Sequence, residues 1–288
     1  MKVLDETFLE NLSPFFRGER GHRRARYIMR LLSIDKVNQV YENSGKFTGA
    51  KFAASLLKDI GVNYLIGNSE RLRQIPGGAF ITIANHPYGG LDGIILIDLF
   101  AGLRPDYKLM VNNIIGLVKT MKENFITVAP SFSNTKKISG ISLHGVREAI
   151  SNLQCGHPIG FFPSGAVSNF SFKDMKVRDR KWQTGILNLI RHVKVPVVPI
   201  RFFDINSSFF YFLGLINWHI RSLRMPSEVF NKRDKETRIS IGNVISVEEL
   251  EQYTDLESLG NFLRKTVYEM PFPSSFIERA RLCSPWNS

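Results

Sequence analysis

Hydrophobic residues fall along this chain in two recurring patterns. Short continuous apolar runs predict strands that are covered on both faces, as in a parallel sheet. We expect strands at residues 79–84, 107–111, 125–129, 159–162, 195–203 and 237–241, and several of these are such runs. Helical spacing of apolar residues predicts helices between them at 92–103, 140–153 and 180–193, and a mostly helical segment at 247–268. Alternating strands and helices predict an α/β sandwich with a mainly parallel central sheet.

The first 70 residues have a different character. Residues 5–60 predict a largely helical segment, and the turn at Pro76-Gly77-Gly78 precedes the first expected strand of the sheet. Arginine is concentrated in this segment, beside aromatic and aliphatic residues, as Arg17, Arg20, Arg23, Arg24, Arg26 and Arg30. This pattern is typical of a helix at an anionic lipid surface and equally of a solvated helix face. We expect a basic helical extension at 1–70 and one globular domain at 71–288.

The composition and net charge of the chain indicate which kinds of partner and compartment to expect. A hydrophobic content of 43% in 288 residues allows a sizeable core, and the formal net charge of +12 favours an anionic partner. No apolar run is long enough to span a bilayer, and the N-terminus lacks the apolar centre of a signal peptide. Cys155 and Cys283 suggest a reducing compartment and show no metal-ligand spacing. The scattered basic residues include no nucleic-acid reader motif, so no nucleic-acid partner is expected.

The first segment with residues suited to catalysis follows the strand expected at 79–84. His86 stands just past the strand end, and Asp92 follows across the turn at Gly89-Gly90. A carboxylate that accepts one ring N–H leaves the other imidazole nitrogen free as a base. The glycines allow the backbone to approach a ligand closely. The alternative is that His86 merely follows a strand and Asp92 merely caps a helix.

Two later segments also combine a strand with prolines. Phe162-Pro163-Ser164-Gly165 follows the strand at 159–162, and Val195-Pro196-Val197-Val198-Pro199 opens the strand at 195–203. Each is explained on its own by a turn or by prolines at a strand edge. Ser164 invites a serine-hydrolase interpretation, but the Gly-x-Ser-x-Gly elbow is missing at that position.

Taken together, the three segments resemble the glycerolipid acyltransferase superfamily. That superfamily has Asn-His-x4-Asp, a Phe-Pro-x-Gly block and a Val-Pro-Val-Pro-like strand in this order. Here Asn85-His86 with Asp92, Phe162 to Gly165 and Val195 to Pro199 carry the resemblance, across roughly residues 72–245. The Asn-His-Pro-x-Gly and Phe-Pro-Ser-Gly forms are most similar to a hemolysin-like bacterial branch. That branch includes O-acyltransferases of amino-acid lipids such as ornithine and glycine lipids.

Three departures from the superfamily pattern bear on function. Five residues, not four, separate His86 from Asp92, and the added residue falls in the Gly-Gly turn. Ser164 occupies the place of a glutamate. The Phe-Ile-x-Arg block aligns with residues 125–128, where Val128 replaces the arginine thought to hold an acceptor's phosphate. The last departure favours a head group other than the phosphate of lysophosphatidic acid.

The resemblance implies a layered α/β/α fold and an acyl transfer that needs no metal or cofactor. His86 would act as general base, oriented by Asp92, and the acyl donor would be an acyl carrier protein or coenzyme A thioester. Asn85, Gly89, Gly90, Phe162, Pro163, Ser164, Gly165 and Arg201 would contact substrate. The acceptor would be a monoacylated amino-acid lipid, and the protein would lie peripherally on the anionic cytoplasmic face of the inner membrane.

Three other functions remain open from the sequence. A 1-acylglycerol-3-phosphate acyltransferase would share the same motifs and make phosphatidic acid. A hydrolase or thioesterase would use Ser164 as nucleophile. A basic membrane-binding or nucleic-acid-binding protein without catalysis would explain the charge alone.

Overall fold

The computed structural model describes residues 10, 16–112, 116, 118–128 and 140–282. An eight-stranded sheet lies at its centre, in the order β10-β1-β9-β8-β2-β5-β3-β4. The strands are β1 (Tyr64–Gly67), β2 (Ile81–Ala84), β3 (Lys108–Asn112), β4 (Phe125–Val128), β5 (Ile159–Phe161), β8 (Val197–Phe202), β9 (Thr237–Ile241) and β10 (Phe276–Glu278). Neighbours pair in parallel except β1 with β10 and β8 with β9. The mainly parallel sheet is therefore confirmed.

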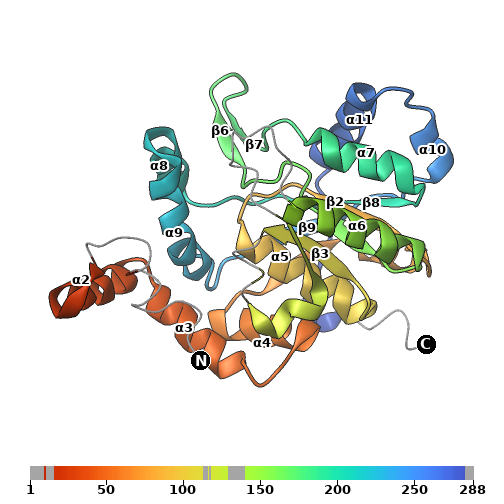
Figure 1. The fold of residues 1–288 in the computed structure, drawn as a ribbon. Coiled ribbons are helices and arrows are strands. Elements are labelled where there is room, and N and C mark those ends of the chain that lie inside the picture. The colour runs from red at the N-terminus through yellow and green to blue at the C-terminus, as the bar shows by residue number, and fades with distance from the viewer. Residues whose placement is uncertain (1–9, 11–15, 113–115, 117, 129–139, 283–288) are drawn as a thin grey trace.

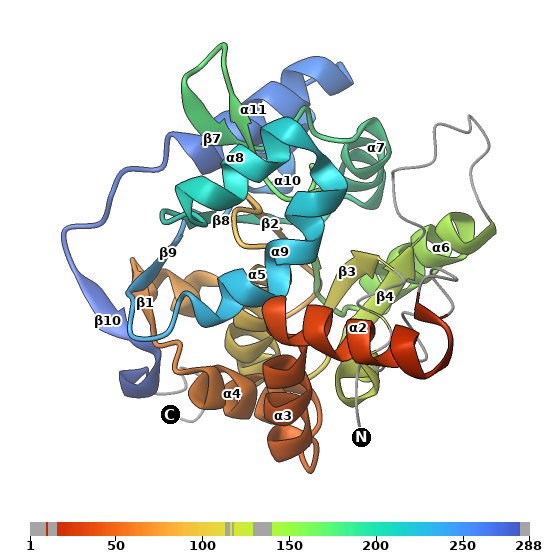
Figure 2. The same cartoon turned by 90° about the vertical axis from the view of Figure 1, so that its left-hand side faces the viewer.

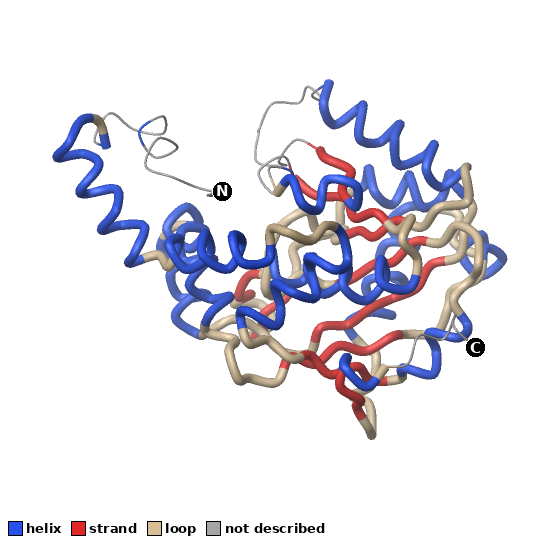
Figure 3. Tube along the Cα trace, turned by 90° about the horizontal axis from the view of Figure 1, so that it is seen from below, coloured by secondary structure: helices blue, strands red, loops and turns tan. Residues whose placement is uncertain are grey.

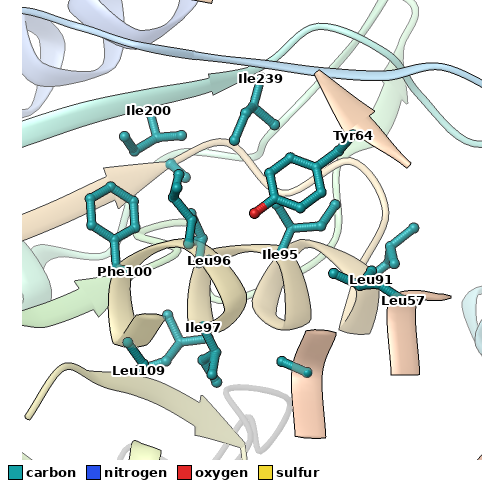
Figure 4. Close-up of a cluster of buried hydrophobic side chains, with 14 of the residues drawn as sticks. Leu57, Tyr64, Leu91, Ile95, Leu96, Ile97, Phe100, Leu109, Ile200 and Ile239 are labelled. Carbon is teal, nitrogen blue, oxygen red and sulfur yellow. The ribbon is translucent and has the colours of Figure 1, made fainter. Parts of the chain in front are cut away.

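Helices cover both faces of the sheet and make it the middle of three layers (Figures 1 and 3). One face packs on α4 (Gly49–Ile60), α5 (Gly90–Leu96) and the π-helical turn Ile97–Ala101 that continues α5. Figure 4 shows that core, in which Ile95 and Leu96 of α5 meet Tyr64, Ile200 and Ile239 from three strands. The other face packs on α6 (Gly140–Gln154), α7 (Thr184–Val193) and α11 (Leu256–Tyr268).

The helices α2 (Gly18–Leu31) and α3 (Ile34–Ser44) precede α4, and α2 projects from the body (Figure 1). The sheet itself begins within the first 70 residues, because β1 pairs with β9 and β10. It therefore draws on residues from both sides of the expected boundary at residue 70. The division into an extension and a domain stays a prediction.

Local hydrogen bonds explain where helices depart from the predicted bounds. The segment expected at 180–193 becomes helical only at Thr184, because the backbone N–H of Gln183 donates to the carbonyl of Pro163 at 2.8 Å. The C-terminal helix is divided into α10 (Val247–Glu251) and α11. Asp255 accepts from the N–H groups of Glu257 and Ser258 and so caps a new helix start. The strand expected at 125–129 is β4, and residue 129 lies outside the described ranges, as does Cys283.

Two hairpins project from the sheet edge that carries the carboxyl ends of β5 and β8. The first is made of β6 (Asn169–Ser171) and β7 (Lys176–Arg178). The second is helical and joins α8 (Ser208–Ile216) to α9 (Trp218–Phe230). The aromatic-rich stretch 209–218 therefore belongs to a helical hairpin, which packs against β6 (Figure 1).

Candidate active site

The site is built on the turn between β2 and α5. β2 is buried along its whole length and ends at Ala84, and α5 begins at Gly90. Gly89 joins them with φ of +81°, a conformation that favours glycine. A Cβ at Gly89 would lie 2.6 Å from Sδ of Met225, so the packing of α9 also requires glycine here. The turn brings His86 back over the first turn of α5.

His86 and Asp92 form a hydrogen-bonded pair. Nδ1 of His86 lies 2.9 Å from Oδ2 of Asp92, and the Asp92 side chain is fully buried whereas that of His86 is 13% exposed. The same Oδ2 accepts from the backbone N–H groups of Tyr88 and Gly89 at 2.9 and 3.0 Å. Because the carboxylate accepts at Nδ1, that nitrogen carries the proton, and Nε2 keeps its lone pair.

Burial raises the pKa of the Asp92 carboxyl above its ordinary value. The hydrogen bond and the charge of His86 act in the opposite direction, followed by the two backbone N–H donors. These donors stabilise the ionised form, which is the form that holds the His86 ring in one tautomer.

A cavity of about 340 Å³ lies against His86 and is lined mainly by apolar side chains. Gly89 and Gly90 line it beside the histidine, and it reaches Val37 on α3 and Val128 on β4. Most of the remaining lining comes from apolar side chains of α3, α4, α5, β3 and the turn that leads into β4, including Tyr41, Phe52, Leu56, Ile94, Leu109, Met121 and Phe125. The cavity is suited in size and lining to an apolar ligand.

The residues of the segment Phe162 to Gly165 differ in whether they line the cavity. Phe162 stacks on the His86 ring with centroids 4.0 Å apart, and both Phe162 and Gly165 line the cavity. The carbonyl of Pro163 accepts from Gln183 at the start of α7. The Ser164 side chain is buried, and its hydroxyl donates to the carbonyl of Ala166 at 2.7 Å. Ser164 is not among the residues that line the cavity, which disfavours the nucleophile role.

Two other predicted contact residues do not line the cavity. Asn85 Nδ2 donates to the carbonyl of Phe202, and its Oδ1 accepts from the N–H of Phe202, at 2.9 and 2.8 Å. Asn85 thereby joins β2 to β8 past the end of their ladder. Arg201 donates to the carbonyl of Met270 at 2.6 Å and lies over the ring of Phe203. Neither residue lines the cavity, and their contacts with substrate stay a prediction.

Asp179 is a buried acid at the site that the sequence analysis does not identify. Its Oδ1 accepts from the backbone N–H of His86 at 3.2 Å and from the hydroxyl of Ser168 at 2.5 Å. The N–H of Ser168 donates in turn to the carbonyl of His86. Burial raises the pKa of the Asp179 carboxyl, and the Ser168 hydroxyl opposes that effect. No sequence signal links residues 93 positions apart.

The described residues include neither a metal-binding cluster nor a membrane-spanning helix. Within those ranges, no group of three or more His, Cys, Asp or Glu side chains gathers as a metal site requires. No helix in the described part of the chain is long and apolar enough to cross a membrane.

Comparison with known proteins gives matches over most of the chain. A family model described as Acyltransferase matches residues 13–273. The chain is 22% identical over 250 residues to a lyso-glycine lipid O-acyltransferase of Bacteroides thetaiotaomicron, covering 85% of this chain and 88% of that protein. A lyso-glycine lipid O-acyltransferase of Phocaeicola vulgatus is 23% identical, with 85% and 86% covered.

Among solved structures, the chain is similar to the 1-acyl-sn-glycerophosphate (LPA) acyltransferase PlsC from Thermotoga maritima. The TM-score is 0.46 at 14% identity, with 85% of this chain and 90% of that chain covered.

Proposed function

Because the chain belongs to the acyltransferase family, we propose that it transfers a fatty acyl group from a thioester to the hydroxyl of a monoacylated amino-acid lipid. The observation that carries the proposal is the apolar cavity that lies directly against the His86–Asp92 pair. A base beside an apolar cavity is the arrangement that O-acylation of a lipid requires.

In the proposed mechanism, Nε2 of His86 removes the proton from the acceptor hydroxyl. The oxygen forms a bond to the thioester carbonyl carbon, and the carbonyl π electrons move to its oxygen. When this tetrahedral intermediate collapses, the carbon–sulfur bond breaks and the thiolate leaves, taking the proton from His86. Asp92 stabilises the imidazolium that exists between the two proton transfers. The thioester is already activated, so the reaction needs neither an acyl-enzyme nor a metal ion.

The cavity is the proposed site of the donor's acyl chain. Its lining of aliphatic and aromatic side chains offers dispersion contacts to the acyl chain and keeps water away from it. With the chain in the cavity, the thioester carbonyl would lie at His86, where Gly89 and Gly90 leave room for the backbone to approach. An acyl carrier protein and coenzyme A both present such a thioester. Both donors are anionic, which suits a chain of net charge +12.

A monoacylated aminolipid is the proposed acceptor. Val128 lines the cavity in the block where phosphate-accepting relatives have an arginine. Both named bacterial relatives are lyso-glycine lipid O-acyltransferases, which supports the same class of acceptor. Such lipids reside in a bilayer, so the protein would work peripherally at an anionic surface, the cytoplasmic face of the inner membrane.

The proposed acceptor is tested by competition. The purified protein is offered equal amounts of lyso-glycine lipid and lysophosphatidic acid, with an acyl carrier protein thioester in one reaction and a coenzyme A thioester in another. Mass spectrometry should detect diacylated aminolipid as the main product. Phosphatidic acid as the main product would contradict the proposed acceptor and favour the 1-acylglycerol-3-phosphate acyltransferase alternative.

A further inference from the structure

The helical hairpin of α8 and α9 carries an exposed apolar surface. Among the described residues, seven of the fourteen exposed large hydrophobic side chains lie between positions 209 and 223. They are Phe209, Phe212, Leu215, Ile216, Trp218, Ile220 and Leu223. Phe210 and Tyr211 are buried, so α8 is anchored by one side and presents apolar residues to solvent on the other. A contiguous surface of this kind marks an interaction site.

The same face of the molecule carries further exposed apolar residues. Figure 2 shows α2, α8 and α9 together on the face turned toward the viewer. Tyr27 and Leu31 are exposed on α2. The β6–β7 hairpin packs against α8 and exposes Phe172 and Met175. Two elements that expose apolar side chains, α2 and the α8–α9 hairpin, therefore share one face of the molecule, and the β6–β7 hairpin packs beside α8.

The charge of this face favours an anionic partner. Residues 205–227 contain no aspartate or glutamate. Their two arginines are engaged within the protein, because Arg221 is buried and Nε of Arg224 lies 3.7 Å from Oε1 of the buried Glu228. The basic charge of this face therefore comes from α2. Helix α2 has one acid, Glu19, against the basic residues Arg20, Arg23, Arg24, Arg26 and Arg30. Aromatic and aliphatic side chains beside surplus arginine match the interface of an anionic bilayer. We propose that the α8–α9 hairpin inserts its apolar face into an anionic membrane while α2 binds the charged membrane surface.

The buried side of this hairpin contacts the turn that carries His86. The hydroxyl of Tyr211 and Nδ2 of Asn206 both donate to the carbonyl of Pro87, at 3.1 Å each. Arg221 donates to the carbonyl of Ser168, whose N–H donates to the carbonyl of His86. Insertion of the hairpin would therefore place the bilayer beside the catalytic turn. This step rests on the proposed function, because a bilayer lipid has to reach that turn to act as acceptor.

Vesicle sedimentation tests the hairpin directly. The double variant Phe212→Ser/Ile216→Ser removes two side chains that are 55% and 62% exposed, and Leu143→Ser on α6 is a matched control at 45%. With vesicles of phosphatidylglycerol and phosphatidylcholine, wild type and control should bind equally, and the double variant should bind at least about tenfold more weakly. Equal binding by the double variant, or a wild-type protein that stays in the supernatant at low salt, would overturn the inference.

A second measurement separates this inference from the proposed reaction. With the acceptor in detergent micelles, the double variant should keep wild-type turnover, whereas with the acceptor in vesicles it should lose activity in parallel with binding. A protein that binds vesicles through the hairpin but transfers no acyl group would refute the proposed function alone. If sedimentation velocity showed a dimer that the double variant abolishes, and vesicles were not bound, a second copy of this chain would be the partner and the inference would be overturned.

Discussion

Nδ1 of His86 lies 2.9 Å from Oδ2 of Asp92, although five residues separate them along the chain. The related superfamily pattern has four residues in this interval. The longer interval is accommodated because Gly89 adopts a positive φ and reverses the chain before α5 begins. Asp92 also accepts from the N–H groups of Tyr88 and Gly89, so the carboxylate fixes the turn as well as the histidine ring.

Asp92→Asn should lower kcat by about 100-fold or more, because a neutral amide stabilises the imidazolium poorly and no longer enforces the correct tautomer. Steady-state kinetics of acyl transfer would measure this. Asp106→Asn is a matched control, since Asp106 Oδ2 lies 2.7 Å from Nδ1 of His157, a pair that does not line the cavity. Similar kcat losses in both variants would argue against a specific role for Asp92.

Gly89→Ala should destabilise the fold by about 1–3 kcal/mol, because alanine is strained at this positive φ and its Cβ meets Met225. Gly90→Ala is the natural comparison, since a Cβ there meets nothing within 4 Å. Urea unfolding of both variants measures the difference. Equal stabilities would show that the turn tolerates a side chain at either glycine.

Leu56→Trp should shift donor preference toward shorter acyl chains by about tenfold, because the larger side chain fills part of the cavity. Lys51→Trp on the same helix is exposed, lies outside the cavity lining, and should leave the preference unchanged. Mass spectrometry of products from mixed long-chain and short-chain donors provides the measurement. An unchanged chain-length ratio in Leu56→Trp would place the acyl chain elsewhere.

Asp179→Asn should change how stability depends on pH. Burial raises the pKa of Asp179 in the folded protein, so its contribution to stability is fully present below the unfolded pKa and is lost as pH rises through the folded pKa. Because asparagine does not ionise, the variant does not lose stability in this way as pH rises. Its free energy of unfolding relative to wild type should therefore increase in urea titrations as pH rises above the ordinary aspartate pKa of about 4. A difference that is independent of pH, or one that falls, would contradict the raised pKa.

The sequence carries enough information for the sheet strands nearest the site and for the histidine. β2, β5 and most of β8 are buried, and their apolar runs reflect that burial directly. β3 alternates between buried and half-buried residues. β1, β6, β7 and β10 were not predicted. β6 and β7 lie largely outside the core, so no apolar run distinguishes them. β1 is a short apolar run that directly follows the segment expected to be helical.

Side-chain roles at the site were harder to predict, because residue type does not reveal hydrogen-bond partners. Asn85 follows the strand end as a ligand-binding residue would, yet both ends of its amide are bound to Phe202, 117 positions away. Asp179 is the reverse case. Nothing in the sequence marks it as a site residue, yet the fold brings its carboxylate to the backbone N–H of His86. The apolar stretch at 209–218 is visible in the sequence, but the sequence does not tell which side of α8 faces solvent.

Acyl transfer by the wild-type protein and by His86→Ala tests the central claim most directly. The assay offers lyso-glycine lipid in micelles with a long-chain acyl thioester and quantifies the diacyl product by mass spectrometry. His157→Ala serves as the matched control, and thermal unfolding checks that all three proteins fold. We predict that His86→Ala loses about 100-fold or more in turnover whereas His157→Ala stays at the wild-type rate. Wild-type turnover in a folded His86→Ala would contradict the account.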